Sequence, residues 1–111
     1  MSNRYLTRST CSTTPILEST DQFLKWLGKL RDPLGKARIL ARLNKAYSGH
    51  IGDTKSICGT VFELRIDVGP GYRVYFIKHN DVMILLCGGD KSSQTRDVVT
   101  AKILARNFKD K

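Results

Sequence analysis

Three basic side chains lie around one predicted β-hairpin and the loop after the next strand: Arg65 in "FELRIDV", Arg73 in "GYRVYF" and Lys91 in "GGDKSS". A guanidinium group binds two phosphate oxygens at once, and fixed cations stabilise the charge that develops when a phosphodiester is attacked. Tyr72 and Tyr75 stand beside Arg73, and a tyrosine ring can stack on a nucleobase. These residue types together suggest RNA binding and attack on an RNA phosphate.

Glu63, Lys55 and Arg96 complete the set of candidate site residues. Glu63 is the candidate general base, provided that neighbouring groups adjust its pKa. Lys55 and Arg96 are predicted to bind RNA, together with the two tyrosines. The alternative interpretation of Tyr72 is a core residue, because its strand parity fits the buried face. The alternative interpretation of Arg73 is an exposed ion pair with Glu63 or Asp67, because surface pairs between strands are common and contribute little.

A metal ion is not expected to take part. Asp67, Asp81, Asp90 and Asp97 are dispersed over predicted loops and turns, whereas two-metal nucleases hold their ions about 3.5–4 Å apart. The three cysteines lack a CxxC spacing, and the two histidines are scattered. The sequence therefore predicts no metal, no cofactor and no small-molecule ligand, and the 2′-hydroxyl of RNA remains as the nucleophile.

The overall charge agrees with a polyanionic partner. The chain of 111 residues has 19 Lys and Arg against 10 Asp and Glu, a formal net charge of +9. This length fits one domain, which we place at residues 14–111 after a basic, flexible tail at residues 1–13. No apolar run approaches the roughly 18–20 residues of a membrane helix. An odd number of cysteines fits a reducing compartment, so a cytoplasmic protein without membrane contact is expected.

Two helices are predicted after a short strand at residues 15–18. Ser19 and Gln22 match a capping box for the first helix. Asp32 and Pro33 match the start of the second, and Gly49 matches its end. The spacing of apolar residues predicts the buried face of this second helix. Its expected members are Leu34, Ala37, Leu40, Leu43 and Tyr47.

A three-stranded antiparallel meander is predicted next, after a polar loop over residues 50–60. In "VFELRIDV" every second residue is apolar, so one strand face is buried and the other carries Glu63 and Arg65. "GPG" forms the first turn, and "GGDKSS" ends the last strand before a third helix capped by Ser92 or Ser93. The element order predicts an α+β fold with helices on one sheet face and a partly open face opposite.

The segments "ELRIDVGPGYRVYF" and "LLCGGDKSSQTRD" closely resemble the HigB-like addiction-module killer proteins of the RelE/ParE toxin superfamily. "WLGKLRD" and "ARILARLNKAYSGHIGD" match the same pattern, so the resemblance covers nearly all of the chain from about Thr14. It implies a small RelE-like fold and an mRNA endonuclease that acts in the ribosomal A site. In this resemblance Arg73 matches the recurrent catalytic arginine, and Arg65 and Lys91 match further basic positions.

The resemblance also implies a type II toxin-antitoxin module, in which we expect a cognate antitoxin with a helix-turn-helix domain. Metal-independent cleavage would leave a 2′,3′-cyclic phosphate or 3′-phosphate and a 5′-hydroxyl. One alternative is a ParE-like inhibitor of DNA gyrase with the same fold. Another is a basic RNA- or protein-binding module without catalysis. Arg73 and Lys91 together favour the nuclease.

Overall fold

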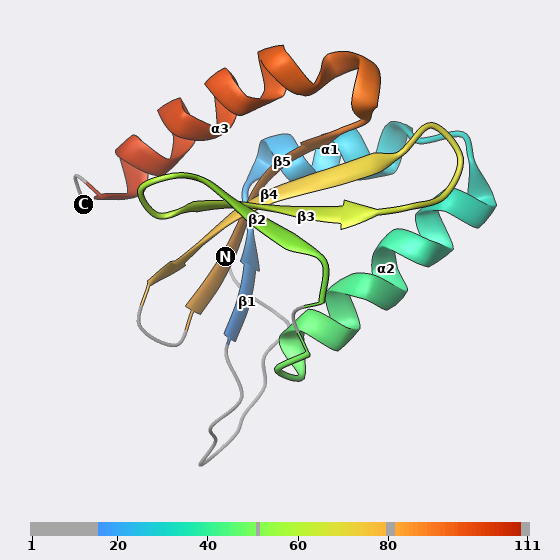
Figure 1. Cartoon of the computed structure of the whole chain (residues 1–111), viewed down its shortest axis with the longest axis horizontal. Coiled ribbons are helices and arrows are strands. Elements are labelled where there is room, and N and C mark those ends of the chain that lie inside the picture. Colours follow the sequence, from blue (N-terminus) through green and yellow to red (C-terminus); the bar gives the residue numbers. More distant parts are fainter. Residues whose placement is uncertain (1–15, 51, 80–81, 110–111) are drawn as a thin grey trace.

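The computed structural model describes residues 16–50, 52–79 and 82–109. Within these residues a mixed sheet of five strands is packed against three helices (Figure 1). The strands are β1 (Ile16–Ser19), β2 (Thr54–Cys58), β3 (Val61–Ile66), β4 (Tyr72–His79) and β5 (Val82–Gly89). The helices are α1 (Asp21–Lys29), α2 (Pro33–Tyr47) and α3 (Gln94–Lys109), with a 3-10 turn η1 (Lys91–Ser93) before α3. The predicted α+β class is confirmed, and the predicted tail at residues 1–13 lies outside the described residues.

The sheet is larger than the predicted three-stranded meander. Strands β3, β4 and β5 do form an antiparallel meander, but β1 pairs in parallel with β5 and β2 pairs antiparallel with β3. The spatial order is therefore β1-β5-β4-β3-β2. The sequence of β2, "TKSIC", predicts a polar loop because it has no apolar alternation. An edge strand needs little apolar content, which explains why the sequence does not reveal this one.

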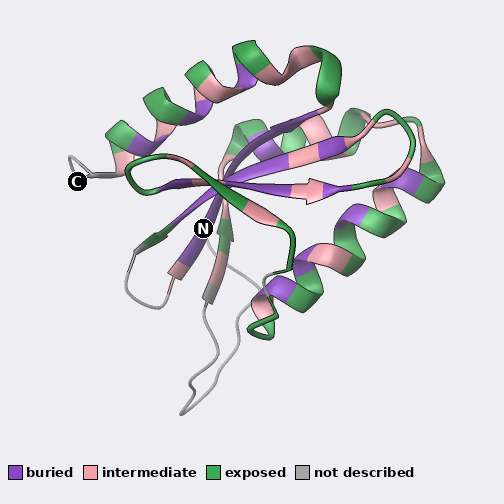
Figure 2. Cartoon of the chain, in the orientation of Figure 1, coloured by how far each residue is buried: buried purple, intermediate pink, exposed green. Residues whose placement is uncertain are grey.

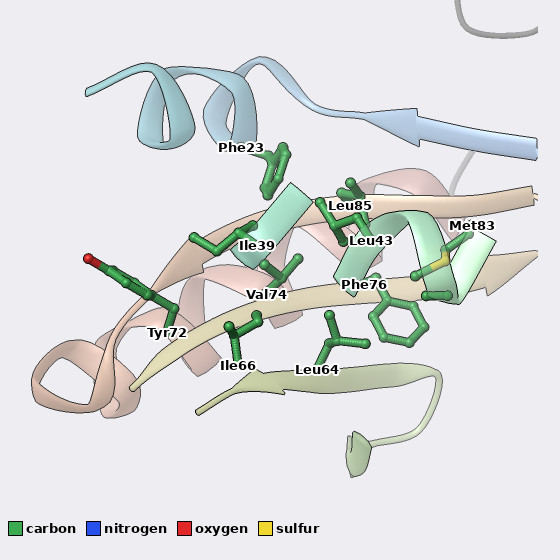
Figure 3. Close-up of a cluster of buried hydrophobic side chains, with 11 residues drawn as sticks. Phe23, Ile39, Leu43, Leu64, Ile66, Tyr72, Val74, Phe76, Met83 and Leu85 are labelled. Carbon is green, nitrogen blue, oxygen red and sulfur yellow. The ribbon is translucent and has the colours of Figure 1, made fainter. Parts of the chain in front are cut away.

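Helices cover both faces of the sheet, which corrects the prediction that all of them pack on one face. Figure 1 shows α2 and α3 on opposite sides of the strands. Side chains from α1 and α2 pack on the face that we call the helix-pair face, where the apolar cluster of Figure 3 lies. On the opposite face, called the α3 face, Ala101 and Ala105 pack against Val61, Ile77 and Leu86.

Helix α2 begins where the sequence predicts. The side chain of Asp32 accepts a hydrogen bond from the Gly35 amide at 3.0 Å, and Pro33 is the first helical residue. Gly49 follows the helix with φ +100°, a conformation that favours glycine. Both ends of this helix are thus encoded by its local sequence.

The predicted buried face of α2 is correct at Leu43 and partly correct at Tyr47, which is half-buried, but wrong at Leu34, Ala37 and Leu40. Ile39 is completely buried, whereas Leu34 and Leu40 are exposed. Figure 2 shows that buried and exposed positions alternate along α2. The helix has apolar residues on two sides, and the two possible phases differ by one residue, or about 100° of rotation. Packing against the sheet selects the phase that buries Gly35, Ile39, Leu43 and Ala46.

Thr20, rather than Ser19, caps helix α1. Its hydroxyl oxygen accepts a hydrogen bond from the Phe23 amide at 3.0 Å and donates one to the Leu86 carbonyl at 2.6 Å. Ser19 is the last residue of β1, so the capping-box prediction is shifted by one position. The same threonine therefore ends the connection from β1 and fixes α1 to β5.

Gly88 and Gly89 belong to β5 and do not form the predicted strand-ending loop. A Cβ atom on Gly88 would clash with the ring of Trp26, and one on Gly89 would clash with Asp97 and Ser93. Successive strand residues point to opposite faces, so each glycine admits a neighbour on its own face. This pair allows α1 and the start of α3 to approach the same strand end.

Candidate functional site

The charged part of the α3 face lies near the turn between β3 and β4. Arg65 of β3 stands directly opposite Arg73 of β4, and in the neighbouring row Glu63 stands opposite Tyr75. Like charges directly opposite one another destabilise a sheet, so the two arginines require a counter-charge. Alternation along β3 places Glu63 on the same face to supply it.

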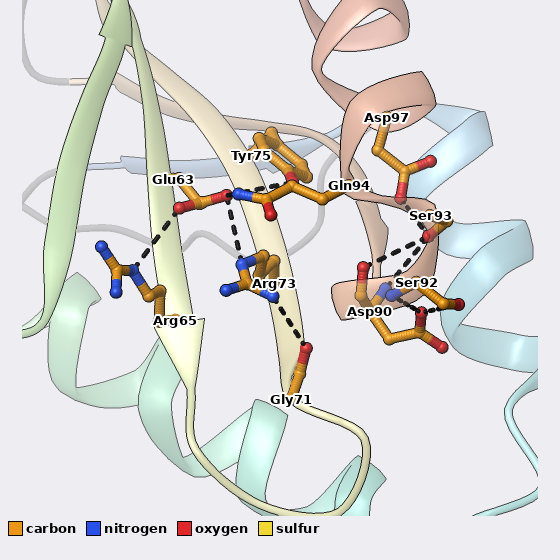
Figure 4. Close-up of polar contacts among 10 residues, drawn as sticks. All are labelled: Glu63, Arg65, Gly71, Arg73, Tyr75, Asp90, Ser92, Ser93, Gln94 and Asp97. Carbon is orange, nitrogen blue, oxygen red and sulfur yellow. Dashed lines mark hydrogen bonds and ion pairs between the residues drawn. The ribbon is translucent and has the colours of Figure 1, made fainter.

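The carboxylate of Glu63 is at the centre of this group and is completely buried, with 0% exposure. Its Oε1 lies 3.5 Å from Nε of Arg65, and its Oε2 lies 3.3 Å from Nε of Arg73. The Tyr75 hydroxyl and the Gln94 amide donate hydrogen bonds to Oε2 at 3.1 and 2.8 Å (Figure 4). A buried carboxylate is tolerated when it is paired and hydrogen-bonded. We call these five residues the Glu63 cluster.

A hollow of about 410 Å³ lies beside the Glu63 cluster. Arg65, Arg73 and Lys91 all line it, so the structure brings together the three cations that were predicted to be catalytic. The turn 69–71 forms part of its wall, and positive φ angles at Gly69 and Gly71 give this turn its shape. The three predicted cations therefore share one concave surface with a narrow glycine turn.

Gly71 lies between two of these cations. Nη1 of Arg73 donates a hydrogen bond to the Gly71 carbonyl at 3.4 Å. A Cβ atom on Gly71 would be 3.9 Å from the same nitrogen and 3.7 Å from Cβ of Lys91. Asp53 and Asp67 also line the hollow, so its charge is mixed. Arg73 and Lys91 are the two cations that lie beside Gly71.

Arg73 does form the ion pair that the alternative interpretation predicted, but the pair is not an exposed one. Its side chain is 12% exposed, against 39% for Arg65. A largely buried guanidinium is held in one orientation, whereas a surface pair is mobile and solvated. The pairing with Glu63 is therefore part of the site's construction.

The two tyrosines do not present a ring to solvent. Tyr72 is buried in the cluster on the helix-pair face, and its hydroxyl donates a hydrogen bond to Oδ2 of Asp32 at 2.7 Å. This hydrogen bond, with burial, raises the pKa of Tyr72 to about 12. Tyr75 is completely buried, and burial together with Glu63 raises its pKa. Tyr72 also lines the hollow, but the burial of both rings argues against the predicted stacking on RNA bases.

Lys55 and Arg96 are not among the residues that line the hollow. Lys55 is exposed on β2, opposite Glu63 in the strand register. The side chain of Arg96 is 80% exposed, and its Nε lies 3.9 Å from Oδ1 of Asp97. It borders a separate, open depression at the start of α3. The structure therefore separates these two cations from Arg73 and Lys91.

Gln94 was missed in the sequence, although it contacts the central carboxylate. It is the first residue of α3, and nothing in its local sequence marks it as a partner of a residue on β3. The turn before it is capped by Asp90, whose side chain accepts from the Ser92 amide at 2.8 Å. Ser93 donates to the carboxylate of Asp97. Asp90 thus caps η1, while Ser93 directly precedes α3 and contacts its first turn.

Neither a metal-binding group nor a membrane-spanning helix is found among the described residues. No three His, Cys, Asp or Glu side chains among these residues form a group that could hold a metal ion. None of the helices in the same segments is both long enough and apolar enough to span a membrane. The buried thiol of Cys87 has its pKa raised to about 12, mainly by burial, so it is a structural residue.

Comparison with known proteins gives one relative and one similar structure of note. No family model matches the chain. An uncharacterized protein from Haemophilus influenzae is 50% identical over 93 residues, which are 83% of this chain and 94% of that protein. The solution structure of the conserved hypothetical protein HP0894 from Helicobacter pylori aligns with 70% of this chain and 96% of its own, at 17% identity and a TM-score of 0.48.

Proposed function

The chain belongs to the same family as the uncharacterized Haemophilus influenzae protein, and we propose that it is an mRNA endonuclease toxin of the HigB-like type. The observation that carries the proposal is the convergence of Arg65, Arg73 and Lys91 on one hollow beside a glycine turn. Guanidinium and ammonium groups in fixed positions are what a phosphodiester needs when charge develops on its oxygens. The RelE-like fold and the cytoplasmic location are part of this proposal.

The reaction we propose is an internal transesterification of RNA. The 2′-oxygen forms a bond to the adjacent phosphorus, the bond from phosphorus to the 5′-oxygen breaks, and a 2′,3′-cyclic phosphate results. Water takes the proton of the 2′-hydroxyl, and Lys91 gives a proton to the leaving 5′-oxygen. Arg73, with Arg65, binds the phosphate oxygens as their negative charge grows. The step is balanced without a redox reagent.

Glu63 is not retained as the general base. It is completely buried and is absent from the lining of the hollow. Its Oε2 accepts hydrogen bonds from Tyr75 and Gln94. Its Oε1 accepts no hydrogen bond from the described residues and lies within ion-pair distance of Arg65, away from the hollow. A general base must come within hydrogen-bond reach of the proton that it removes.

The substrate we propose is mRNA on the ribosome, and the partner is a helix-turn-helix antitoxin. Both follow from the resemblance of "GYRVYF" and "GGDKSS" to the toxin superfamily. The net charge of +9 favours an RNA substrate and would also speed capture by an acidic partner surface. Co-expression with the product of the neighbouring gene should restore growth and give a complex that co-purifies. Failure of any neighbouring product to do so would contradict the addiction-module assignment.

Induction in a bacterial host tests the reaction directly. We expect translation to stop and mRNA fragments to carry 5′-hydroxyl ends, with DNA supercoiling unchanged. Lys91→Ala should slow cleavage strongly without unfolding the protein, because Lys91 is exposed. Arg73→Lys keeps the charge but loses the two-pronged contact, and we expect about a 100-fold loss of cleavage.

The matched control is Lys25→Ala, which removes an exposed cation from α1 and should leave cleavage unchanged. Fragments with 5′-phosphate ends, or cutting across a 2′-deoxy position, would contradict the proposed reaction. Intact mRNA together with inhibited gyrase would select the ParE-like alternative.

A further inference from the structure

Glu63 is a completely buried charged residue that the proposed reaction does not use, and its contacts point to a different role. It lies outside the hollow but contacts Arg65 and Arg73, the two arginines that line it. We propose that Glu63 is a positioning residue that fixes these two guanidinium groups for phosphate binding. This inference rests on the proposed function, because it concerns the same site.

The atoms involved support positioning. A guanidinium has five N–H donors, and Glu63 forms an ion pair with each arginine at Nε, the nitrogen nearest to the stem, without a hydrogen bond to either Nε. In Arg73 a second point is fixed, because Nη1 donates to the Gly71 carbonyl at 3.4 Å. These two contacts, together with the covalent attachment to the stem, restrict the orientation of the planar group. The remaining terminal N–H groups of Arg73 are then available at the hollow, which this residue lines.

Glu63 is itself held in place by two neutral donors. Tyr75 of β4 and Gln94 of α3 both donate to its Oε2, so the carboxylate is fixed from a strand and from a helix (Figure 4). Prior fixation of a binding group reduces the ordering that a ligand must impose. Tyr75 and Gln94 therefore act on the arginines through Glu63, and the start of α3 contributes to a site that it does not line.

Neutralising Glu63 distinguishes positioning from a simple charge effect, because the two predict opposite changes in the affinity for RNA. Glu63→Gln removes a negative charge beside a phosphate site, so electrostatics alone predicts tighter binding of RNA. If Glu63 positions the arginines, the same change releases both and weakens binding. A general base would affect cleavage of RNA but would not be needed to bind an uncleavable strand.

The experiment measures binding of a fluorescent, 2′-deoxy-substituted single-stranded oligonucleotide by anisotropy across a salt series. Glu63→Gln should bind about tenfold more weakly than wild type, equivalent to one lost charge-assisted hydrogen bond. The slope of log affinity against log salt should fall by about one. The matched control is Glu18→Gln, the same chemical change at an exposed residue of β1, and it should bind as wild type or slightly more tightly.

A second variant covers the case in which Glu63→Gln does not fold. Gln94→Met keeps a similar side-chain volume but removes the 2.8 Å hydrogen bond to Glu63, and it should weaken binding about two- to threefold. A folded Glu63→Gln or Gln94→Met protein that binds as tightly as Glu18→Gln would overturn the positioning role alone. A wild-type protein that binds neither the free oligonucleotide nor the same oligonucleotide on the ribosome would overturn the proposed function, and this inference with it.

The pH dependence of cleavage gives an independent readout. Loss of a positioning residue should lower the rate of the Glu63→Gln protein at every pH while the shape of the profile is kept. Loss of a general base should instead remove the acidic limb of the profile. A Glu63→Gln profile without that limb would overturn positioning and restore the general-base assignment.

Discussion

The two faces of the sheet are built from the same strands but serve different purposes. On the helix-pair face, side chains such as Leu64, Val74 and Phe76 join residues of α1 and α2 in one continuous apolar cluster. The α3 face is apolar only where Ala101 and Ala105 pack on it, and beyond them it becomes the charged Glu63 cluster. The comparison shows that the candidate site occupies the part of the sheet where the covering helix begins.

Small and long side chains of α3 produce this division. The alanines allow the helix to approach the strands closely, whereas Gln94 at its start reaches Glu63 through a hydrogen bond. The helix-pair face has no comparable polar centre among the described residues, apart from the hydroxyl of Tyr72 at its edge (Figure 3). Substitutions on the helix-pair face should therefore mainly affect packing, whereas those on the charged part of the α3 face should mainly affect ion pairing.

The largest effect on stability is expected on the helix-pair face. Ile39 is 0% exposed and its neighbour Leu40 is 47% exposed. Ile39→Ala should lower the free energy of unfolding by about 2–5 kcal/mol, because it leaves a cavity, while Leu40→Ala should cost less than about 1 kcal/mol. Urea denaturation of both variants measures this. If Leu40→Ala costs as much stability as Ile39→Ala, or more, the face of α2 that carries Ile39 is not the one packed on the sheet.

A steric change should come next, at the strand end that both faces share. Gly89→Ala should destabilise the protein by about 1–3 kcal/mol, because the new methyl group must displace Asp97 and Ser93. Gly28→Ala is the control: no atom lies near its Cβ position in α1, and alanine should stabilise that helix by about 0.5–1 kcal/mol. Thermal unfolding of the pair should give shifts of opposite sign, and a harmless Gly89→Ala would show that α3 is not closely packed there.

On the charged part of the α3 face, the two arginines should be unequal. Arg73→Ala should destabilise the protein by about 1–2 kcal/mol more than Arg65→Ala, because the Arg73 side chain is less exposed and its loss leaves a buried carboxylate poorly paired. The alternative interpretation of the sequence predicted that Arg73 forms an exposed ion pair, which would contribute little to stability. Chemical denaturation at several salt concentrations tests the difference, since exposed pairs are screened more strongly. If both variants lose the same stability and this loss falls with added salt, the ion pair of Arg73 is an exposed one.

The smallest effect concerns the hydrogen bond between Tyr72 and Asp32. The Gly35 amide and then the Tyr72 hydroxyl lower the pKa of Asp32 below the usual aspartate value of 3.8, so its ionised form stabilises the fold above that value. This contribution is lost as pH falls through the lower folded pKa. The pKa of Tyr72 is raised to about 12, so the stabilisation by its protonated form is lost as pH rises from 10 to about 12. Tyr72→Phe should remove the alkaline contribution and reduce the acid one, because the Gly35 amide still lowers the pKa of Asp32. Unfolding curves across pH would measure both changes. A Tyr72→Phe protein with the wild-type acid and alkaline dependence would contradict this coupling.

Much of the fold follows from local sequence signals. The alternation in "VFELRIDV" predicts which residues of β3 face each side, and Asp32-Pro33 and Gly49 predict the limits of α2. The rotation of α2 could not be predicted in the same way, because it has apolar residues on two sides and only packing chooses between them. Strand β2 was missed because edge pairing depends on a neighbour rather than on its own residues.

The candidate site could also be predicted only in part from the sequence. Residue type and strand parity were enough to predict that Arg65 and Arg73 share a face, and the structure also brings Lys91 to the same hollow. The burial of Glu63 and Tyr75 depends on where α3 crosses the sheet, which strand alternation does not specify. Gln94 could not be found because its contact joins residues 31 positions apart.

The position of β5 has a consequence for the order in which the protein can assemble during synthesis. Strand β5 lies between β1 and β4, and Thr20 reaches its partner Leu86 across 66 residues of chain. Contacts so distant in sequence form late, because the intervening loop must close first. Lys91 follows β5, so a nascent chain without that strand has neither a complete sheet nor the full set of cations. A chain that stalls on the ribosome before residue 89 should therefore be inert, and the hollow should form only when nearly the whole domain has emerged.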